Sequence, residues 1–451
     1  MPAAVAQSKR TQLRRGLRLV PLAAATYFMV AGGPYGIEDI LGGAGYLKAL
    51  AILLVLPLIW SFPTALMIGE LASAIPQEGG FYIWVRRAMG PFWGYQEAWL
   101  SLAASIFDMA IYPTLFLLYL NRLLPAWTEG WRGTLWELAL IAVCVLWNLR
   151  GAPAVGEGSV ALFALLLSPF AVLVIAAAWH GMHLHGNTVW RSSAVGAGGL
   201  STAVLVALWN YMGWDNASTV AQEVEDPQRN YPRAMLLTTV IVALSYIVPL
   251  AAVAFAGLDV SQFTTGSWAD AASRLAGPWL GVAIVVGGAL TGLGMFNALT
   301  MSYARLPMVL AEDKLLPSFI ASRNRYGVPW VAVLLCATAW ALALQFSFER
   351  LISIDLMLYG GSLILEFIAL VVLRFREPGL SRPFRAGSLA TAIGLGVFPA
   401  VLIVYAAVVA RNERMAHMPA LVFGLIVAAA GPLFYSISRM AAGRSVSAQP
   451  Q

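Results

Sequence analysis

Long apolar stretches, separated by short polar ones, follow one another along most of this 451-residue chain. A helix needs about 20 mainly apolar residues to cross a bilayer. By this measure the sequence predicts twelve membrane-spanning helices, at about residues 18–44, 50–74, 91–121, 135–150, 158–180, 201–224, 232–256, 277–311, 329–347, 351–374, 388–410 and 418–440. An even number of crossings puts both ends of the chain on the same side of the membrane.

The first predicted helix is interrupted at residues 31–39, where three glycines and Pro34 disfavour helical backbone. Glu38 and Asp39 close this stretch, at a depth where charge is costly. Irregular backbone within a membrane survives only where protein buries it or where it lines a watery cavity. We therefore expect this segment to form part of a binding site. The alternative is a glycine–proline kink between packed helices, with the two acids near an interface.

The sixth predicted helix is interrupted over residues 209–215 and resumes to Val224. Broken helices at corresponding positions in two halves of opposite topology are typical of inverted-repeat transporters, whose substrate site lies near the membrane midplane. No residue-by-residue repeat between the halves is visible, so the symmetry rests on the positions of the breaks. The resulting organisation is a cytoplasmic tail (1–17), a first inverted repeat (18–180), an external loop (181–200), a second inverted repeat (201–376), two further helices (388–440) and a cytoplasmic tail (441–451).

Composition supports a membrane protein, since 60% of residues are hydrophobic and 11% are charged, against roughly 25% charged in soluble domains. Most of the 28 lysines and arginines fall in segments predicted to lie on one side of the membrane. This bias places both termini in the cytoplasm and predicts a multi-pass protein of the plasma (inner) membrane. The formal charge of +6 is therefore explained by topology and contact with membrane lipids, and no nucleic-acid partner is expected.

Acidic residues inside predicted helices are candidate functional residues, because a central Asp costs about 2.5–3.5 kcal/mol to insert. Asp108 and Tyr112 are four residues apart and share a helix face. An acid and a phenol on one face can hold an ammonium group by charge, hydrogen bonding and aromatic contact. The alternative is an Asp108 that is protonated or bonded to a neighbouring helix.

Further candidates lie in and beyond the second break. Asp215 is a candidate ligand contact or proton carrier. Trp209 precedes the break and can close over a ligand as a flat lid, or else serve in packing or anchoring. Glu223, near the cytoplasmic end, fits a gating salt bridge and a solvated position equally well. Glu366 has apolar neighbours throughout and is either a proton site or a structural acid bonded to another helix.

Several function classes are not supported by the sequence. No phosphate-binding Walker loop and no hydrolase or metalloprotease motif occurs in a credible context. Cys144 and Cys336 lie in apolar runs and offer neither a disulfide framework nor a metal site. We therefore expect no enzyme activity, no cofactor, no metal and no catalytic residue. A channel is disfavoured as well, because channels usually repeat short pore elements across an oligomer.

The run from Gly32 to Asp39 resembles the amino acid–polyamine–organocation superfamily of transporters, and more narrowly its polyamine uptake branch, known from plants and trypanosomatids. The resemblance covers nearly the whole chain and extends to residues 76–82, 90–94, 108–113, 223–227 and 365–367. It implies an all-α leucine-transporter-type fold of five plus five helices, with helices 1 and 6 broken and two C-terminal helices added. It also implies a substrate site between the two breaks, facing helices 3, 8 and 10.

The resemblance assigns roles to individual residues. The three glycines of the first break match the unwound loop of helix 1. Trp209 matches the gating aromatic of arginine/agmatine exchangers, and Asp215 matches the helix 6 acid that those exchangers use in their response to pH.

The chain departs from the family pattern in two places. Leu299 and Tyr303 stand on helix 8 where the polyamine branch carries acids, which removes counter-charges for a polycation at that wall. Leu166 stands three residues before Pro169, where some proton-coupled amino acid carriers place a lysine. Proton coupling would then rest on carboxylates or on another group.

Together these observations predict a proton-coupled symporter of amino acids or polyamine-like cations that works by alternating access as a monomer or homodimer. A neutral amino acid carrier or an exchanger without proton coupling is the alternative, and an embedded enzyme or a channel is more remote. Symport and antiport both remain open. The candidate substrate-binding residues are Gly32, Gly33, Tyr35, Gly36, Glu38, Asp108, Tyr112, Trp209, Asn210, Trp214 and Asp215. The candidates for proton coupling or gating are Asp215, Glu223, Glu366 and Trp209.

Overall fold

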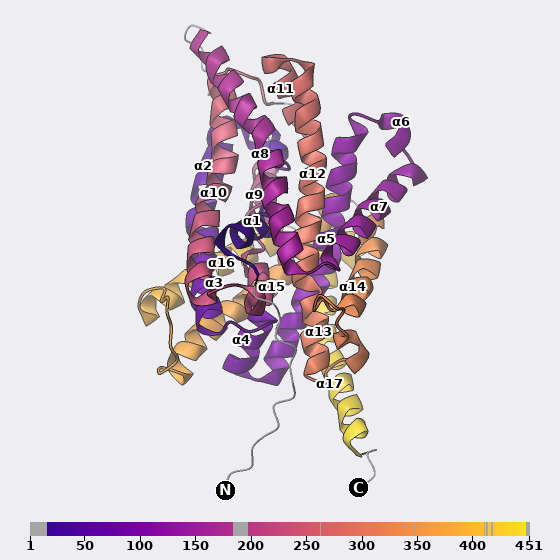
Figure 1. Cartoon of the computed structure of the whole chain (residues 1–451). Helices are drawn as coiled ribbons and strands as arrows, with labels where there is room; N and C mark the ends of the chain where they lie inside the picture. The colour runs from indigo at the N-terminus through magenta and orange to yellow at the C-terminus, as the bar shows by residue number, and fades with distance from the viewer. Residues whose placement is uncertain are drawn as a thin grey trace.

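The computed structural model describes residues 16–183, 197–261, 263–346, 348–409, 411, 414–415 and 418–447. Most of the predicted N-terminal tail, much of the predicted external loop and the last residues of the C-terminal tail lie outside this part of the chain. The described residues are almost entirely helical (Figure 1). Their strands are β1 (Arg414–Met415) and β2 (Met418–Pro419), which pair antiparallel in a small hairpin.

The helices vary widely in length. In chain order they are α1 (Leu19–Val30), α2 (Glu38–Leu56), the π-helix η1 (Pro57–Ser61), α3 (Phe62–Ala74), α4 (Gly80–Met89), α5 (Pro91–Asn121), α6 (Pro125–Thr128), α7 (Trp131–Asn148), α8 (Ala152–His183), α9 (Ala197–Trp209), the 3₁₀-helix η2 (Trp214–Glu223), α10 (Pro227–Phe255), α11 (Ser267–Ala276), α12 (Pro278–Tyr303), α13 (Arg305–Glu312), the 3₁₀-helices η3 (Ser318–Ala321) and η4 (Ala343–Gln345) on either side of α14 (Trp330–Leu342), α15 (Phe348–Arg376), α16 (Leu389–Val409) and α17 (Ala420–Ser447).

Eight helical segments within the described residues are long and apolar enough to cross a membrane, at 38–74, 91–121, 152–183, 227–255, 278–312, 351–376, 389–409 and 420–440. Two shorter apolar helical segments lie at 19–30 and 330–345. The prediction of an all-α, multi-pass membrane protein is therefore confirmed. The twelve-helix arrangement remains a prediction.

Two element boundaries differ from the sequence prediction. The predicted gap between the first two helices is a kink within α2, where Gly45 adopts a left-handed φ of 69°. Only glycine reaches this region without steric cost, so the chain turns there without a loop. The helix predicted to resume after the second break is instead the 3₁₀-helix η2.

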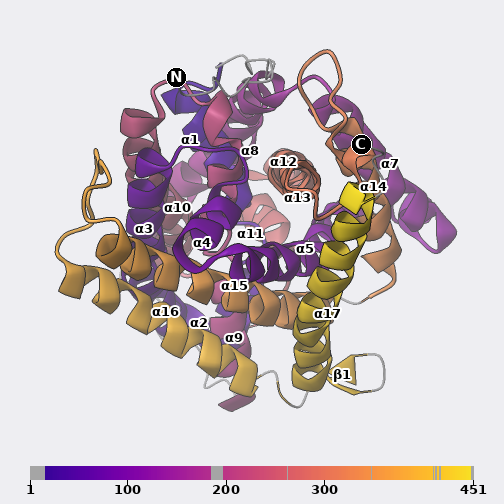
Figure 2. The ribbon, with the colours of Figure 1, turned by 90° about the horizontal axis from the view of Figure 1, so that it is seen from below.

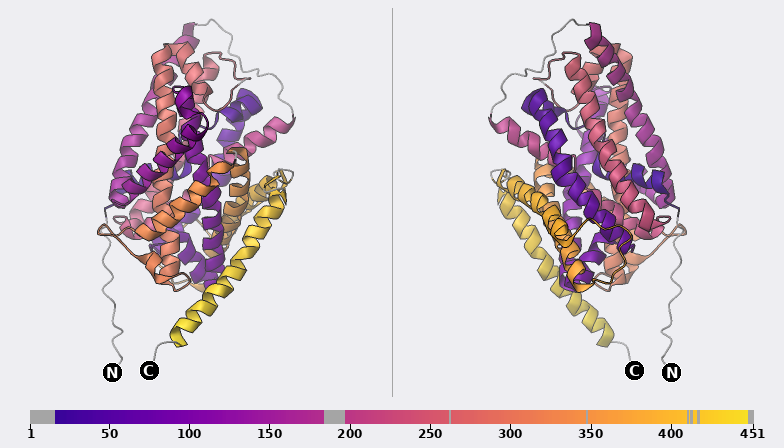
Figure 3. Two further views of the ribbon diagram at one scale, coloured as in Figure 1. Left: turned by 90° about the vertical axis from the view of Figure 1, so that its right-hand side faces the viewer. Right: turned by 90° about the vertical axis from the view of Figure 1, so that its left-hand side faces the viewer.

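The helices differ in how far they are buried. In the most apolar stretch of each helix, 72% of the residues of α5 and 67% of those of α15 are buried inside the protein. The corresponding share is 17% in both α16 and α17. Figure 2 shows α16 and α17 along the outer edge of the bundle, and Figure 3 shows α17 running obliquely along one side. The helices α5 and α15 therefore form part of the protein core, while α16 and α17 add an outer layer.

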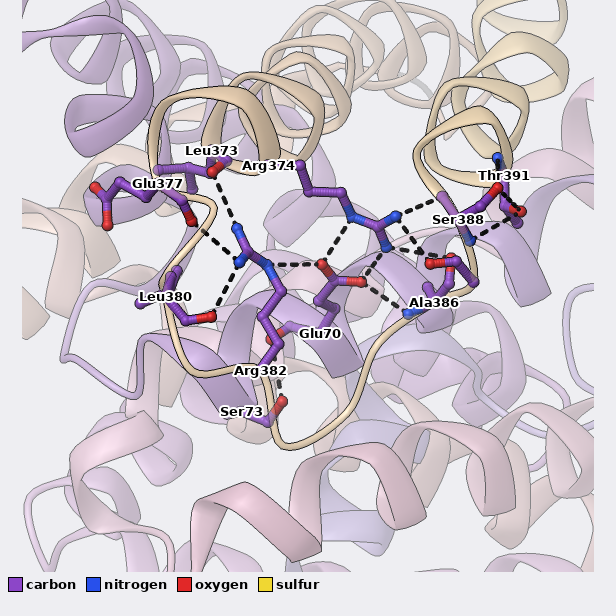
Figure 4. Close-up of polar contacts among 11 residues, drawn as sticks. Glu70, Ser73, Leu373, Arg374, Glu377, Leu380, Arg382, Ala386, Ser388 and Thr391 are labelled. Carbon is purple, nitrogen blue, oxygen red and sulfur yellow. Dashed lines mark hydrogen bonds and ion pairs between the residues drawn. The ribbon is translucent and has the colours of Figure 1, made fainter.

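Glu70 on α3 ties that helix to the end of α15 and to the segment before α16 (Figure 4). Its carboxylate accepts hydrogen bonds from Arg374 Nε at 2.9 Å and from the backbone N–H of Ala386 at 2.8 Å. Arg382 Nε lies 3.2 Å from the same carboxylate. This buried cluster is a structural anchor, because donors from two other segments engage both oxygens of Glu70.

Candidate functional site

The first break occupies residues 31–37, between α1 and α2. Gly33 and Gly36 have φ values of 72° and 84°, in the left-handed region that other residues rarely adopt. Gly32 is held closely by α12, since a Cβ there would lie 2.4 Å from Thr291 Cγ2. The glycines therefore permit both the turn and the close approach of neighbouring helices.

Carbonyl groups of this break already have protein partners. Gly32 O accepts from Thr291 Oγ1 at 2.8 Å, and Pro34 O accepts from Trp268 Nε1 at 2.6 Å. Gly36 O accepts from Asn210 Nδ2 at 3.4 Å, which joins the first break to the second. Because these acceptors are engaged, carboxylates rather than loop carbonyls are better placed to bind an ammonium group.

Glu38 lies at the N-terminus of α2 and is fully buried. Its carboxylate accepts from Gly36 N at 2.7 Å, from Gly266 N at 3.0 Å and from the Tyr119 hydroxyl. Three donors from separate segments hold Glu38 in a position that fixes the break. The Gly36 amide is one of these donors, so it is not free to bind another group. Asp39, next to Glu38, accepts from Thr265 Oγ1 at 2.8 Å.

Tyr35 lies on the same side of the break as Glu38. Its hydroxyl donates to Ile284 O at 2.9 Å, and its ring packs edge-on against Tyr119 and Phe170. This hydroxyl therefore supports the contact between the break and α12.

The second break lies between α9 and η2, at residues 210–213. Gly213 has a φ of 89°, and a Cβ there would lie 2.3 Å from Met29 O. Trp214 donates through Nε1 to Tyr211 O at 2.8 Å. Asn210 contacts the first break, as described above, while the Trp214 indole nitrogen serves the local backbone.

Asp108 and Tyr112 share one face of α5, as the spacing predicts, and the Tyr112 hydroxyl donates to Asp108 Oδ1 at 2.5 Å. The Tyr303 hydroxyl from α12 reaches the other oxygen, Oδ2, at 3.3 Å. The rings of Tyr112 and Trp209 are stacked, with centroids 6.3 Å apart and planes 26° from parallel. The structure thus brings together a carboxylate, two phenols and an indole beside the second break.

Asp215, at the start of η2, follows the second break directly and lies near this group. It accepts from the Tyr359 hydroxyl at 2.6 Å, and Tyr359 in turn accepts from Gly213 N at 3.0 Å. Asp215 is close enough to Asp108 for the two carboxylates to repel each other when charged. Both acids are buried.

Asp355 on α15 was missed by the sequence analysis. It is 0% exposed, and neither carboxylate oxygen has a hydrogen-bond partner. It lies within electrostatic range of Asp108 and Asp215. An acid within the apolar run 351–358 could have been recognised as a candidate. It lies near the predicted start of that span, however, where acidic residues are common and do not indicate a functional site.

A second group of acids, Glu97 on α5 and Glu366 on α15, lies farther along the same two helices. Glu366 is fully buried with both oxygens unpartnered, and it interacts electrostatically with Asp215 and Glu97. Glu97 accepts from Ser101 Oγ at 2.9 Å through one oxygen, and its other oxygen has no partner. The structure therefore places Glu366 beside another acid and gives it no hydrogen-bonding helix neighbour.

Glu223 belongs to a separate cluster, at the end of η2. It pairs with Arg305, whose Nε lies 3.1 Å from Glu223 Oε1 and 3.6 Å from Glu78 Oε1. Arg323 extends the cluster, lying 3.1 Å from Glu78 and 2.8 Å from Glu312. Burial raises the pKa of Glu78, while the nearby guanidinium groups act in the opposite direction. Of the two positions considered for Glu223, the salt bridge is the one observed.

No basic side chain of the described residues pairs with the acids at the centre of the bundle, which are Glu97, Asp108, Asp215, Asp355 and Glu366. Among the described residues, the buried basic side chains are Arg305 and Arg374, and both pair with acids outside the centre. The same part of the chain holds no cluster of acids, histidines and cysteines suited to a metal ion. The site is thus a buried cluster of acidic and aromatic side chains contributed by α5, α9, η2, α12 and α15.

Comparison with known proteins identifies the family of this chain. Residues 24–430 match the amino acid permease family. Polyamine transporter PUT1 of Oryza sativa subsp. japonica is 37% identical over 379 residues, which cover 82% of this chain and 69% of PUT1. Polyamine transporter RMV1 of Arabidopsis thaliana is 33% identical over 417 residues, covering 91% of this chain and 84% of RMV1.

A bacterial amino acid transporter is more distantly similar. The serine/threonine exchanger SteT of Bacillus subtilis is 26% identical over 332 residues, covering 71% of this chain and 74% of SteT. The family match spans most of the sequence, and the plant relatives exceed 30% identity over most of their own length. The chain therefore belongs to the amino acid permease family of the amino acid–polyamine–organocation superfamily, in which it fits the polyamine uptake branch, and it is a transporter.

Proposed function

We propose that this protein is a secondary active transporter that carries a polyamine-like cation across the plasma membrane by alternating access. The observation that carries the proposal is the buried group of Asp108, Asp215 and Asp355, which no basic side chain of the described residues neutralises. Buried charge must be compensated, and here a substrate ammonium group or a proton would do so. The relatives named as polyamine transporters support the same substrate class.

An amino acid is the second candidate substrate, and the similarity to a serine/threonine exchanger favours it. Its carboxylate would need free backbone amides at the first break. The Gly36 amide is already bound to Glu38, and the buried side chains that meet beside the second break include Asp108 and Asp215. These two features favour a cation over a zwitterion.

The proposed architecture is the five-plus-five inverted repeat with two added helices and cytoplasmic termini. In this arrangement the two breaks line the substrate site, and the cluster around Arg305 is the cytoplasmic gate. The gate joins η2 to α13 through the Glu223–Arg305 pair. Opening it would separate these elements and release the substrate inward, with Trp209 as the aromatic lid of the site.

Proton coupling is proposed for Glu366, with Glu97 beside it. A carboxylate buried without a partner is more stable when protonated than when charged. Loss of that proton would change the charge next to Asp215 and thereby bias the equilibrium between inward and outward states. The interaction of Glu366 with Asp215 supports this coupling between proton and substrate sites.

A thermal-shift screen of the purified protein tests the substrate class. We expect putrescine and spermidine to raise the unfolding temperature, since a ligand that binds only the folded state stabilises it. Asp108→Asn should reduce this stabilisation, whereas Asp259→Asn, in an exposed loop, should preserve it. Stabilisation by neutral amino acids alone would show that the proposed substrate is wrong.

A further inference from the structure

We propose that Asp355 is a second counter-charge of the substrate site, so that the site selects organic cations with two ammonium groups over those with one. This inference rests on the proposed function and narrows its substrate to diamines and polyamines. Asp355 lies on α15, which packs against α5, the helix that carries Asp108.

The first observation is that Asp355, like Glu366 at the proposed proton site, lacks the protein donors that most other buried acids have. Several protein groups donate hydrogen bonds to, or form ion pairs with, Glu38, Glu70 and Glu223. Asp108 and Asp215 each accept from at least one tyrosine. Asp355 is equally buried, yet neither of its oxygens has a partner. A structural role would require donors, because an unsatisfied buried carboxylate is costly.

The second observation concerns the groups that lie near the Asp355 carboxylate. Asp355 interacts electrostatically with Asp108 and Asp215, and the phenols of Tyr112 and Tyr303 feel its charge as well. These are the groups that surround the proposed ammonium site. Asp355 therefore lies near these groups, on a helix that packs against α5.

The charge balance then indicates the substrate. The site holds three carboxylates, of which Asp215 already accepts from the Tyr359 hydroxyl. One ammonium group bound at Asp108 leaves Asp355 buried without a partner. Two ammonium groups on one flexible aliphatic chain neutralise both Asp108 and Asp355 and leave Asp215 to its tyrosine partner.

Asp355 is distinct from the proposed proton site. Asp355 and Glu366 are 11 residues apart on α15, and Asp108 and Glu97 are 11 apart on α5. Eleven helical residues make about three turns and span about 16 Å. The Asp108–Asp355 pair and the Glu97–Glu366 pair thus lie on the same helix faces but at different depths, which allows one pair to hold substrate and the other a proton.

The test compares putrescine with butylamine, which has one ammonium group on the same four-carbon chain, as ligands of the purified protein and as competitors of putrescine uptake. The wild-type protein should bind putrescine at least about tenfold more tightly, the gain expected from one more charge-assisted hydrogen bond. Asp355→Asn should weaken putrescine by a similar factor and leave butylamine within about threefold. Asp355→Glu should recover part of the loss, and Asp259→Asn should match the wild type.

Two results would overturn the inference. One is a wild-type protein that does not distinguish the two amines, a measurement that needs no variant to fold. The other is an Asp355→Asn protein that elutes as the wild type on size exclusion and binds putrescine equally well. If the wild type neither binds nor carries any amine, the proposed function itself fails, which separates that outcome from a failure of Asp355 alone.

Discussion

Buried carboxylates in this protein differ chiefly in their partners, and the partners separate structural acids from candidate functional ones. Glu38 was expected at the substrate, yet its three donors come from the break itself, from α5 and from the segment before α11. Those donors lie up to 228 residues away, so sequence inspection had no means of finding them. Asp108 and Tyr112, by contrast, are four residues apart, and helical periodicity was sufficient to pair them.

The glycines of the two breaks were recognisable from the sequence, but their steric roles were not. Gly213→Ala should strongly destabilise the protein, since the new Cβ would lie 2.3 Å from Met29 O and the φ of 89° is unfavourable for alanine. A lowered unfolding temperature in detergent is the readout. Gly379→Ala is the matched control, because no heavy atom lies within 4 Å of the added Cβ. Equal unfolding temperatures for the two variants would contradict the described packing of the second break.

Among the elements, α5 and α15 carry most of the unneutralised acids. Sequence periodicity identified both helices and their apolar character, and the structure adds that Asp108 interacts with Asp355 and Glu97 with Glu366. The pairing could not be derived from the sequence, because it depends on how two helices separated by more than 200 residues are aligned. The 3₁₀ form of η2 was missed for a similar reason: Thr219 and Asn216 bond across to Ser302 on α12.

The proposed proton role of Glu366 predicts a selective defect. Glu366→Gln should abolish stimulation of uptake by an imposed pH gradient, because the amide cannot carry the proton. Exchange of labelled for unlabelled substrate across the membrane should continue, since exchange requires no net proton movement. Glu157→Gln, at an exposed position of α8, is the control. A Glu366→Gln protein that still responds to the gradient would show that the proton binds elsewhere.

At the scale of the whole molecule, ion-pair clusters tie distant elements together. Glu70 joins α3 to α15, and Arg305 joins η2, α13 and the turn before α4. Arg305 could not be assigned a role from the sequence, because its partners Glu223 and Glu78 are 82 and 227 positions away along the chain. The all-α, membrane-spanning character followed from hydropathy, whereas the cross-links between helices required coordinates.

The proposed gate predicts an accessibility change. Arg305→Ala should expose the cytoplasmic side of the site, because breaking one partner of a buried ion pair costs about 3–5 kcal/mol in the closed state. A cysteine at Ser218, which is buried against Gly80, reports opening through its rate of thiol labelling. The two native cysteines are buried and contribute little background. Arg229→Ala removes an exposed pair and should leave labelling unchanged; equal labelling in both variants would argue against the gate.

Uptake of labelled putrescine into proteoliposomes tests together the substrate, its site and the coupling. We expect saturable uptake that is faster with an acidic exterior, is inhibited by spermidine and is not inhibited by neutral amino acids. Asp108→Asn should reduce it at least about tenfold, since the ammonium loses its charged partner. Putrescine uptake no greater than in protein-free liposomes, together with saturable uptake of a neutral amino acid, would contradict the assignment of this transporter to organic cations.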